Sequence, residues 1–251
     1  MVNFVGAGCG AADLITVRGK LLIEQADVII YAGSLVNPQL LEYAKKDCQI
    51  HNSAHMTLEQ VIDVIKAAEH EKKMTVRLHT GDPSLYGAIR EQMDRLDELG
   101  IKYDICPGVS SFCGAAAALR AEYTLPDVSQ TVIITRMAGR TPVPEKESIA
   151  ALAAHNATMV IFLSTGLLKE LSAELIRGGY KPDTPAAIVY KASWADQKVC
   201  RCTVEDLAQT AADNGITKTA LICVGYFLGN DYSLSKLYDK SFETEFRKAE
   251  I

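Results

Sequence analysis

The stretch MTVRLHTGDP, residues 74–83, predicts how this chain folds. Its first six residues predict a β-strand that runs directly into a bend made of Thr80, Gly81, Asp82 and Pro83. Proline is favoured in the first turn of a helix, where its missing N–H needs no partner. Pro83 therefore predicts a helix over about residues 84–99, which Gly100 ends. A strand, a tight bend and a helix in this order form the repeating unit of a parallel sheet.

The same succession occurs on both sides of this stretch and predicts a first domain over residues 1–120. Thr57 and Gln60 have the spacing of a capping box, in which each side chain satisfies a backbone N–H of the other residue. Strands are expected at 2–5, 26–32, 74–79 and 103–106, and helices at 16–25, from 57, at 84–99 and at 110–121. This alternation favours an α/β domain with a largely parallel sheet.

A polar, proline-containing connector at residues 121–129 separates this domain from a second one at 130–230. Strands are expected there at 131–135, 159–164, 186–191, 198–203 and 220–226, and helices at 145–155, 167–177 and 204–214. A turn at residues 194–196 favours an antiparallel pair on either side of it, so the second sheet is expected to be mixed. The charged tail, residues 231–251, is expected to be a surface helix or a frayed end. The fold class is therefore α/β with two α/β domains.

The composition describes an ordinary globular protein and excludes several functional classes. Of 251 residues, 48% are hydrophobic and 23% are charged. The net charge of −5 argues against general nucleic-acid binding, which needs a basic surface to replace phosphate counterions. The longest apolar runs are far shorter than the roughly 20 residues that span a membrane. The first ten residues lack the features of a signal peptide. We expect a cytoplasmic protein with neither a membrane nor a nucleic-acid partner.

Cysteine and histidine give no metal site. The seven cysteines include no Cys-x-x-Cys pair, and several lie in expected strands, where cysteine behaves as a small hydrophobe. They are expected to be reduced thiols in a reducing compartment. Cys200 and Cys202 share one strand face, but two thiols alone do not make a zinc site. His51 and His55 lie in an expected loop without an evident carboxylate partner, and we expect them to be solvated.

Three glycine-bearing loops, residues 6–10, 80–83 and 107–111, each follow a strand and precede a helix. Ligands of open α/β sheets bind at this carboxyl edge, and glycine lets the backbone approach them closely. The loops therefore predict a binding crevice. The first has the spacing G-x-G-x-G, and no acidic residue follows the second strand, so the nicotinamide-dinucleotide pattern is not met. The P-loop pattern also fails, because no Gly-Lys-Ser/Thr follows. A tight turn without a ligand is the alternative.

Two further features have alternative interpretations. Asp82 is expected at a helix start, where it either caps the helix or accepts hydrogen bonds from a ligand's amine or hydroxyls. Arg136 and Arg140 flank a glycine and are followed by Pro142 and Pro144, which stiffen the chain. Arginines on a rigid loop suit carboxylate recognition. The alternative is a solvated connector that caps a helix beginning at Glu145.

Taken together, these motifs resemble the tetrapyrrole methylases, the class III methyltransferases that use S-adenosylmethionine. The resemblance covers about residues 1–228 and rests on the segments GAG-x-G (6–10), DLIT (13–16), ADV (26–28), HTGDP (79–83), YGAI (86–89) and PGVS (107–110). The segments RTPVPE (140–145) and YKASW (190–194) resemble the branch that methylates carbon 11 of precorrin-4 or cobalt-precorrin-4 in cobalamin biosynthesis.

The resemblance implies two α/β domains with the methyl donor in a cleft between them, commonly in a homodimer. By position, the implied donor contacts are Cys9, Thr80, Gly81, Asp82, Leu85, Ser110, Ser111, Leu163, Ala192 and Ala220. The implied acceptor is a polycarboxylate tetrapyrrole, for which we expect the contacts Arg136, Arg140, Lys191, His79 and Arg120. No proton-abstracting base is assigned.

The first loop departs from the pattern Gly-Pro-Gly-Asp-Pro-Asp that is usual in the family. Here it reads Gly8-Cys9-Gly10-Ala11-Ala12-Asp13, so cysteine replaces the first proline and alanine replaces the first acid. The turn is expected to be less stiff as a result. Two other functions stay open at this point: methylation of another tetrapyrrole carbon by the same class of enzyme, and a nucleotide-binding module without catalysis.

Overall fold

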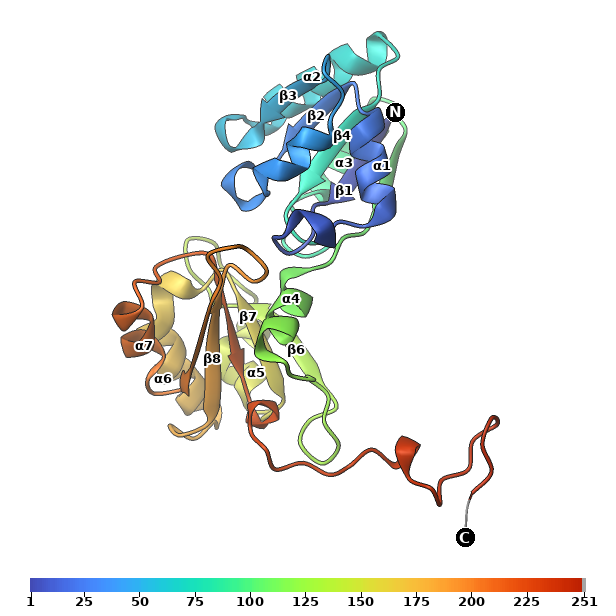
Figure 1. Ribbon diagram of the computed structural model, residues 1–251. Helices are drawn as coiled ribbons and strands as arrows, with labels where there is room; N and C mark the ends of the chain where they lie inside the picture. The colour runs from blue at the N-terminus through green and yellow to red at the C-terminus, as the bar shows by residue number, and fades with distance from the viewer. Residues whose placement is uncertain (250–251) are drawn as a thin grey trace. The chain divides into compact units, whose positions relative to one another are not determined.

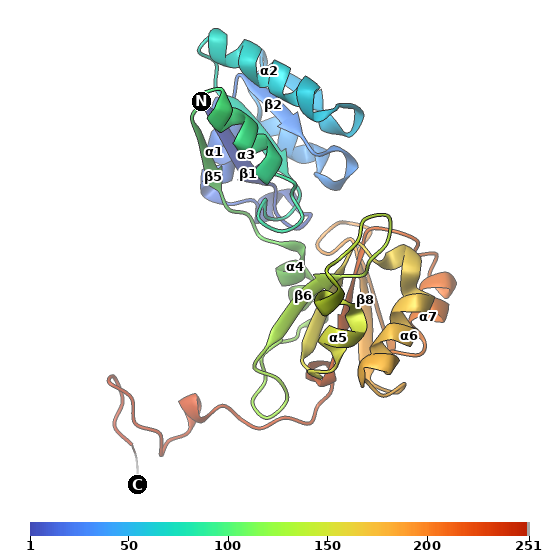
Figure 2. The ribbon, with the colours of Figure 1, turned by 180° about the vertical axis from the view of Figure 1, so that it is seen from behind.

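The computed structural model describes residues 1–249, which divide into two units. Unit 1 comprises Met1–Ala115 together with Lys191–Gln197, and unit 2 comprises Ala116–Tyr190 and the chain from Lys198 onwards. Figures 1 and 2 show a sheet with helices packed on it in each unit. The predicted α/β class is confirmed for both. The segment Lys191–Gln197 belongs to unit 1 although the strands on either side of it belong to unit 2.

The sheet of unit 1 is entirely parallel, as the sequence predicted. Its strand order is β3-β2-β4-β1-β5. The strands are β1 (Val2–Gly6), β2 (Val28–Tyr31), β3 (Gln49–Asn52), β4 (Thr75–His79) and β5 (Tyr103–Cys106). The central strands β1 and β4 are buried along their whole length, which is typical of a parallel sheet covered on both faces. Their register pairs Gly6 with His79, so the first two glycine loops start side by side.

Helices cover both faces of this sheet. They are α1 (Val17–Gln25), α2 (Leu58–His70) and α3 (Arg90–Glu98). Helix α4 (Ser111–Leu119) follows the third glycine loop, and it begins in unit 1 and ends in unit 2. Figures 1 and 2 show α1 on one face of the sheet and α3 on the other. The capping box at Thr57 and Gln60 is present and begins α2. Two separate clusters of buried apolar side chains, one on each face, hold these layers together.

The helix predicted over residues 84–99 begins only at Arg90, and this prediction was wrong for its first six residues. Residues 84–89 form a loop in which Tyr86 and Ala88 have positive φ angles of 56° and 49°. Gly87 packs against Pro83 so closely that a Cβ atom on it would lie 2.2 Å from the Pro83 carbonyl oxygen. Pro83 permits a helix but does not require one. The close turn between Pro83 and Gly87 gives the chain a non-helical path instead.

A second correction concerns residues 49–52, of which His51 and Asn52 were expected to lie in a loop. They form β3, the edge strand, which pairs in parallel with β2. All four residues are exposed or half-buried, so the strand carries no continuous apolar run that would reveal it. His51 therefore lies in a strand, whereas His55 lies in the short 3₁₀ turn that follows it.

The sheet of unit 2 is mixed, as predicted, with the order β6-β7-β10-β8-β9. Its strands are β6 (Val132–Arg136), β7 (Thr158–Phe162), β8 (Pro185–Tyr190), β9 (Lys198–Thr203) and β10 (Ala220–Val224). Strand β6 runs parallel to β7, whereas β10 is antiparallel to both β7 and β8. The predicted antiparallel pair of β8 and β9 is confirmed.

Among the described residues, unit 2 has three α-helices, of which the first and the third are shorter than expected and the second has the expected length. They are α5 (Ile149–Ala153), α6 (Leu168–Gly178) and α7 (Leu207–Asp213). The helix expected from residue 145 is interrupted because the Ser148 side chain accepts a hydrogen bond from the Ala151 N–H and starts α5 there. Leu171, Leu175 and Ile188 lie in one fully buried apolar cluster that joins these helices to the sheet.

The tail, expected to be a surface helix or a frayed end, forms no long helix over residues 231–249. Figure 1 shows it as an extended segment, and its one short helical turn is Lys236–Tyr238. The Arg247 guanidinium donates to the carbonyls of Leu237, Asp239 and Phe242 and so closes the tail on itself. None of the helices within residues 1–249 is long and apolar enough to cross a membrane.

The loops after β1, β4 and β5 meet through glycine backbones. A Cβ atom on Gly108 would lie 2.2 Å from the Gly81 carbonyl oxygen and 2.7 Å from the Gly6 Cα atom. A Cβ atom on Gly6 would lie 2.5 Å from the Gly108 Cα atom. Three backbones thus pass one another at distances that only glycine allows.

We predict that Gly108→Ala destabilises unit 1 by about 1–3 kcal/mol, because backbone atoms must move to admit the methyl group. Urea unfolding followed by fluorescence measures this, since the single tryptophan, Trp194, lies in unit 1. The control is Gly166→Ala, where a Cβ atom would meet nothing within 4 Å. An unchanged unfolding midpoint in Gly108→Ala would contradict the close packing of the loops.

Candidate functional site

The loops after β1 and β4 are tied together by backbone hydrogen bonds. The Ala7 N–H donates to the His79 carbonyl at 2.7 Å. Gly8 and Gly81 exchange two bonds, Gly8 N–H to Gly81 O at 3.2 Å and Gly81 N–H to Gly8 O at 2.9 Å. Gly8 and Gly81 have φ angles of 82° and 62°, which other residues seldom adopt. The two loops therefore form one rigid strip at the carboxyl edge of the sheet.

Asp82 joins the third loop to this strip. Its Oδ2 atom accepts from the Gly108 N–H at 2.8 Å, and its Oδ1 atom accepts from the Ser84 N–H at 2.8 Å and from the Ser84 hydroxyl. Partial burial raises the pKa of Asp82, but the hydrogen bonds from Ser84 and Gly108 outweigh burial and hold the pKa below its usual value of 3.8. Asp82 was predicted to be either a helix cap or a ligand contact. The helix cap is wrong, because α3 starts eight residues later.

A buried polar network supports the loop that follows Asp82. The Arg77 guanidinium donates to the Ile30 carbonyl and to Gln92 Oε1, each at 3.0 Å. Gln92 in turn donates to the Ala88 carbonyl at 3.0 Å. Burial lowers the pKa of Arg77 to about 10, so the side chain stays charged at neutral pH. The network fixes Ala88, one of the two loop residues with positive φ.

His79 is neutral and inaccessible. Only 3% of its surface is exposed, and its Nε2 atom has no hydrogen-bond partner within residues 1–249. Burial, and then the nearby charge of Arg77, lower the pKa of His79 to about 3. His79 was predicted as a possible contact of acceptor carboxylates. The structure gives it no positive charge at neutral pH with which to bind one.

The other side of the first loop is covered by Lys191–Gln197. The Ser193 hydroxyl lies 3.3 Å from Cys9 Sγ and accepts from the Ala11 N–H at 3.0 Å. The Asn37 side chain donates to the Gly10 carbonyl at 2.9 Å. Sequence reasoning missed both Ser193 and Asn37. Ser193 is 184 residues from Cys9, and no local pattern indicates a contact at that separation.

The remaining predicted donor contacts of unit 1 lie along these loops. Thr80 is half-buried, and its hydroxyl is without a hydrogen-bond partner among the described residues. Leu85 closes a turn by donating from its N–H to the Asp82 carbonyl at 3.2 Å. Ser110 and Ser111 stand at the start of α4, where the Ser110 carbonyl accepts the first helical N–H groups. Ala192 is 5% exposed.

Three predicted residues of unit 2 share one edge of its sheet. Arg136 ends β6, Leu163 follows β7 directly, and Ala220 begins the antiparallel strand β10. Leu163 is 68% exposed and has a φ angle of 53°, which projects an apolar side chain from a strained position. The Ala220 carbonyl accepts from the Thr165 hydroxyl at 3.2 Å.

Some of the predicted cationic side chains already have hydrogen-bond or ion-pair partners within the protein, and others are exposed. Arg136 donates to the carbonyls of Thr141 at 3.1 Å and Pro142 at 2.7 Å, so it holds the loop that carries Arg140. Arg140 is exposed on that loop. Lys191 lies 2.6 Å from the Asp196 carboxylate, with its Nζ atom over the Trp194 ring. Arg120 is exposed just after α4 and has a φ angle of 52°.

Comparison with known proteins identifies the family. The model of the tetrapyrrole (corrin/porphyrin) methylases matches residues 1–208. The chain belongs to this family. Cobalt-precorrin-4 C(11)-methyltransferase of Methanocaldococcus jannaschii is 57% identical over 249 residues, which are 99% of this chain and 96% of that protein. Precorrin-4 C(11)-methyltransferase of Pseudomonas aeruginosa is 45% identical over 250 residues, 99% of each chain. The X-ray structure of a cobalt-precorrin-4 methyltransferase matches with a TM-score of 0.89 and 47% identity, over 91% of this chain and 96% of that one.

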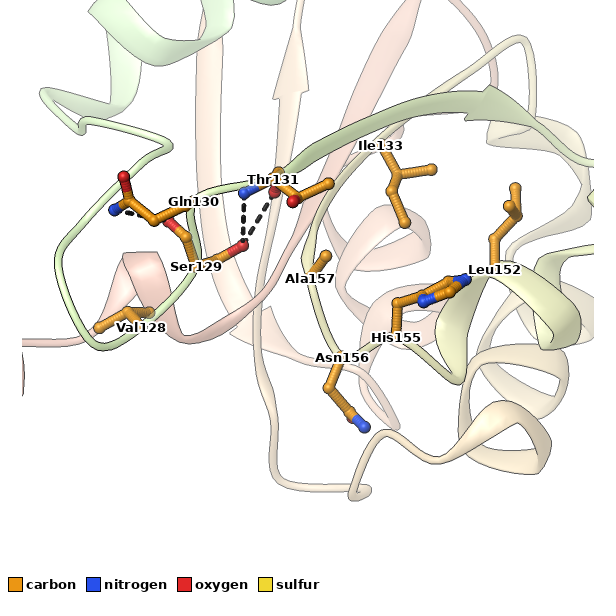
Figure 3. A pocket seen from close by; sticks show the side chains of 9 residues that line it. All are labelled: Val128, Ser129, Gln130, Thr131, Ile133, Leu152, His155, Asn156 and Ala157. Atoms are coloured by element: carbon orange, nitrogen blue, oxygen red, sulfur yellow. Dashed lines mark hydrogen bonds between the residues drawn. The ribbon is translucent and has the colours of Figure 1, made fainter.

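A cavity in this tetrapyrrole methylase lies in unit 2, and none of the predicted site residues lines it (Figure 3). It has a volume of about 510 Å³ and is lined by Val128, Ser129, Gln130, Thr131, Ile133, Leu152, His155, Asn156 and Ala157. Ser129 is hydrogen-bonded to both the N–H and the carbonyl of Thr131. The lining contains no arginine or lysine, which a polycarboxylate needs in an enclosed site. The cavity is therefore unsuited to a tetrapyrrole.

Residues 1–249 contain no group of three or more His, Cys, Asp or Glu that could hold a metal ion. The seven cysteines are all free thiols. Burial raises the pKa of Cys202 to about 11, which keeps this thiol protonated and unsuited to metal binding at neutral pH.

We predict that His79 causes the free energy of unfolding to decrease as the pH is lowered. The unfolded histidine binds a proton below its ordinary pKa of about 6.5, whereas folded His79 stays neutral down to about 3. Within this window the unfolded state binds more protons, so stability decreases by at most about 1.4 kcal/mol per pH unit as pH falls. Urea unfolding at pH 7, 6, 5 and 4 measures the slope.

His79→Gln removes the titrating group and is expected to flatten the pH dependence between pH 6 and 4. His55→Gln, at an exposed histidine of the same unit, is the matched control and keeps the wild-type slope. Equal slopes in the wild type and His79→Gln would show that the buried histidine is not the source.

Proposed function

We propose that this tetrapyrrole methylase transfers a methyl group from S-adenosylmethionine to carbon 11 of precorrin-4 or cobalt-precorrin-4 in cobalamin biosynthesis. The observation that carries the proposal is the 57% identity to a cobalt-precorrin-4 C(11)-methyltransferase over nearly the whole of both chains. A non-catalytic nucleotide-binding module is disfavoured, because it would not need the cationic loop of Arg136 and Arg140.

The loops at the edge of the first sheet suit the donor. Gly8 and Gly81 present bare backbone, and the buried Thr80 hydroxyl has no partner within the described chain, so it is available to a ligand. The proposed donor contacts are Cys9, Thr80, Gly81, Asp82, Leu85, Ser110, Ser111, Leu163, Ala192 and Ala220. When bound, S-adenosylmethionine supplies a methyl group attached to a positively charged sulfur. Backbone carbonyls near Thr80 and the ionised Asp82 carboxylate favour such a charge.

Methyl transfer needs alignment more than acid–base chemistry. An electron-rich ring carbon would bond to the methyl carbon in line while the methyl–sulfur bond breaks and S-adenosylhomocysteine leaves. Orientation alone can contribute on the order of 7–11 kcal/mol to such a step. The rigid strip of Gly8 and Gly81, fixed to the third loop by Asp82, provides a preorganised surface for this purpose. No proton-abstracting base is proposed, and His79 is buried and neutral.

The acceptor carries many carboxylates, and an acidic protein must meet it with local cations. We propose Arg140, Lys191 and Arg120 as direct contacts, with Arg136 holding the Arg140 loop and His79 confined to packing. Arg140 and Arg120 are exposed. Lys191 is paired with Asp196, so it would exchange this partner for an acceptor carboxylate.

We also propose that the protein is a cytoplasmic homodimer. The seven free thiols suit a reducing compartment. Exposed apolar side chains of the tail suit an interface: Tyr232, Leu234, Leu237, Tyr238, Phe242 and Phe246. Light scattering measures the mass in solution, and cell fractionation measures the location. A monomeric mass, or recovery outside the cytoplasm, would contradict this part of the proposal.

The function is tested with methyl-labelled S-adenosylmethionine and a panel of acceptors: precorrin-4, cobalt-precorrin-4, earlier and later corrin precursors, and uroporphyrinogen III. Label is expected at carbon 11 of precorrin-4 or its cobalt form, located by NMR. Uroporphyrinogen belongs in the panel because the uroporphyrinogen-III C-methyltransferase of Bacillus subtilis is 32% identical to this chain. Label at another carbon would contradict the proposed specificity. If label is transferred to none of the acceptors, the proposed function is refuted.

Two substitutions test the division of roles between the loops. Arg140→Ala is expected to raise the KM for the tetrapyrrole about tenfold, as the loss of one charge-assisted hydrogen bond would do, with unchanged donor affinity. Asp82→Ala is expected to weaken donor binding and to destabilise the fold by roughly 1–3 kcal/mol. Steady-state kinetics and calorimetric titration measure these effects. A loss of donor affinity in Arg140→Ala, or normal donor affinity in Asp82→Ala, would reverse the assignment.

A further inference from the structure

The first glycine loop contains two residues that cannot stiffen it from within. Cys9 leaves its φ angle free, whereas a proline would fix it. Ala11 has no side-chain acceptor, whereas an aspartate could bond to a nearby backbone N–H. They are two of the three positions, the third being Ala12, at which the chain departs from the usual family pattern. The loop nevertheless lies against Gly81 in a defined conformation.

One side chain contacts both positions. The Ser193 hydroxyl accepts from the Ala11 N–H at 3.0 Å and lies 3.3 Å from Cys9 Sγ. A hydroxyl has one donor and two acceptor sites, so it can make both contacts at once. Cys9 is 6% exposed, so its thiol meets Ser193 in a site with little water. Ser193 thus bonds to the loop from outside at the positions where internal restraints are missing.

The backbone around Ser193 packs on the same loop. A Cβ atom on Gly10 would lie 2.3 Å from Trp194 Cδ1 and 2.6 Å from the Ala192 carbonyl oxygen. From the other side, the Asn37 amide donates to the Gly10 carbonyl at 2.9 Å. The loop is therefore enclosed between Asn37 and residues 192–194.

The segment that carries Ser193 is itself held in a strained conformation. Lys191 and Ser193 have φ angles of 46° and 66°, which are unfavourable for residues other than glycine. The Ser193 N–H donates to Gln197 Oε1 at 2.7 Å, and the Trp194 N–H donates to the Lys191 carbonyl at 3.0 Å. Such strain persists only where the surrounding contacts fix the conformation, and it places the Ser193 hydroxyl between Cys9 and Ala11.

We propose that Ser193 is a positioning residue that holds the first glycine loop in its donor-binding conformation. Cys9 and Ala11 do not restrict the loop themselves. The Ser193 hydroxyl, from a distant part of the chain, restricts it by contacting both residues. The proposal rests on the proposed donor site, because Cys9 is one of its contacts. Ser193 itself is not assigned a contact with the donor.

The test uses the full chain and S-adenosylhomocysteine, which binds without turnover. In Ser193→Ala, the dissociation constant measured by calorimetry is expected to rise roughly tenfold, which corresponds to the loss of one or two hydrogen bonds. Without any ligand, the amides of residues 8–12 are expected to exchange hydrogen faster than in the wild type. Ser148→Ala is the control, because it removes one serine-to-backbone bond in unit 2, and it is expected to change neither quantity.

Two further variants separate positioning from general stability. Ser193→Gly also removes the hydroxyl but relieves the positive φ angle, so it is expected to lose donor affinity while losing less thermal stability than Ser193→Ala. Adding Ala11→Asp to Ser193→Ala supplies an acceptor within the loop and is expected to recover most of the lost affinity.

Each outcome decides the proposal. Wild-type affinity in Ser193→Ala, or faster exchange without a change in affinity, overturns the positioning role. Failure of Ala11→Asp to recover any affinity overturns the explanation by loop stiffness. If the wild type does not bind S-adenosylhomocysteine at all, the proposed function fails, whereas the exchange of residues 8–12 still tests whether Ser193 holds the loop.

Discussion

The close passage of three glycine backbones at the carboxyl edge of the first sheet is the constraint on which the site depends. Gly6 and Gly108 approach each other and the Gly81 carbonyl oxygen to distances that exclude a Cβ atom on either residue. Asp82 then fixes the arrangement by accepting from the Gly108 N–H. Because these bonds are made by the protein itself, the loops are ordered before a ligand arrives, and the entropy of ordering them is not lost on binding.

The electrostatics of the site suit positioning rather than proton transfer. Arg77 is buried and charged, but its hydrogen bonds go to Gln92 and to a backbone carbonyl, so it supports a loop. His79 is kept neutral by burial and by that same charge. Asp82 stays ionised and is occupied by backbone N–H groups. The charged residues near the loops thus fix the backbone, as a reaction that needs alignment requires.

Sequence reasoning succeeded where local chemistry decides the structure. The buried strands, the capping box at Thr57 and the antiparallel pair of β8 and β9 follow from periodicity, side-chain spacing and turns. It failed where a longer-range contact overrides a local preference. The helix expected from residue 84 starts at Arg90, because Asp82 and Gly87 close the intervening chain into a tight loop. Strand β3 was missed because its residues are exposed or half-buried and its pairing with β2 arises only in the folded sheet.

The sequence by itself determined the α/β class, the parallel and mixed sheets, the three glycine loops and the family resemblance. Each of these depends on local patterns that are only a few residues long. Only the tertiary structure decided that Asp82 clamps Gly108, that His79 is buried and neutral, and that Ser193 contacts Cys9 and Ala11. These facts depend on contacts between residues 26 to 184 positions apart, or on burial by neighbouring elements. Such contacts exist only once the sheet and its loops have come together.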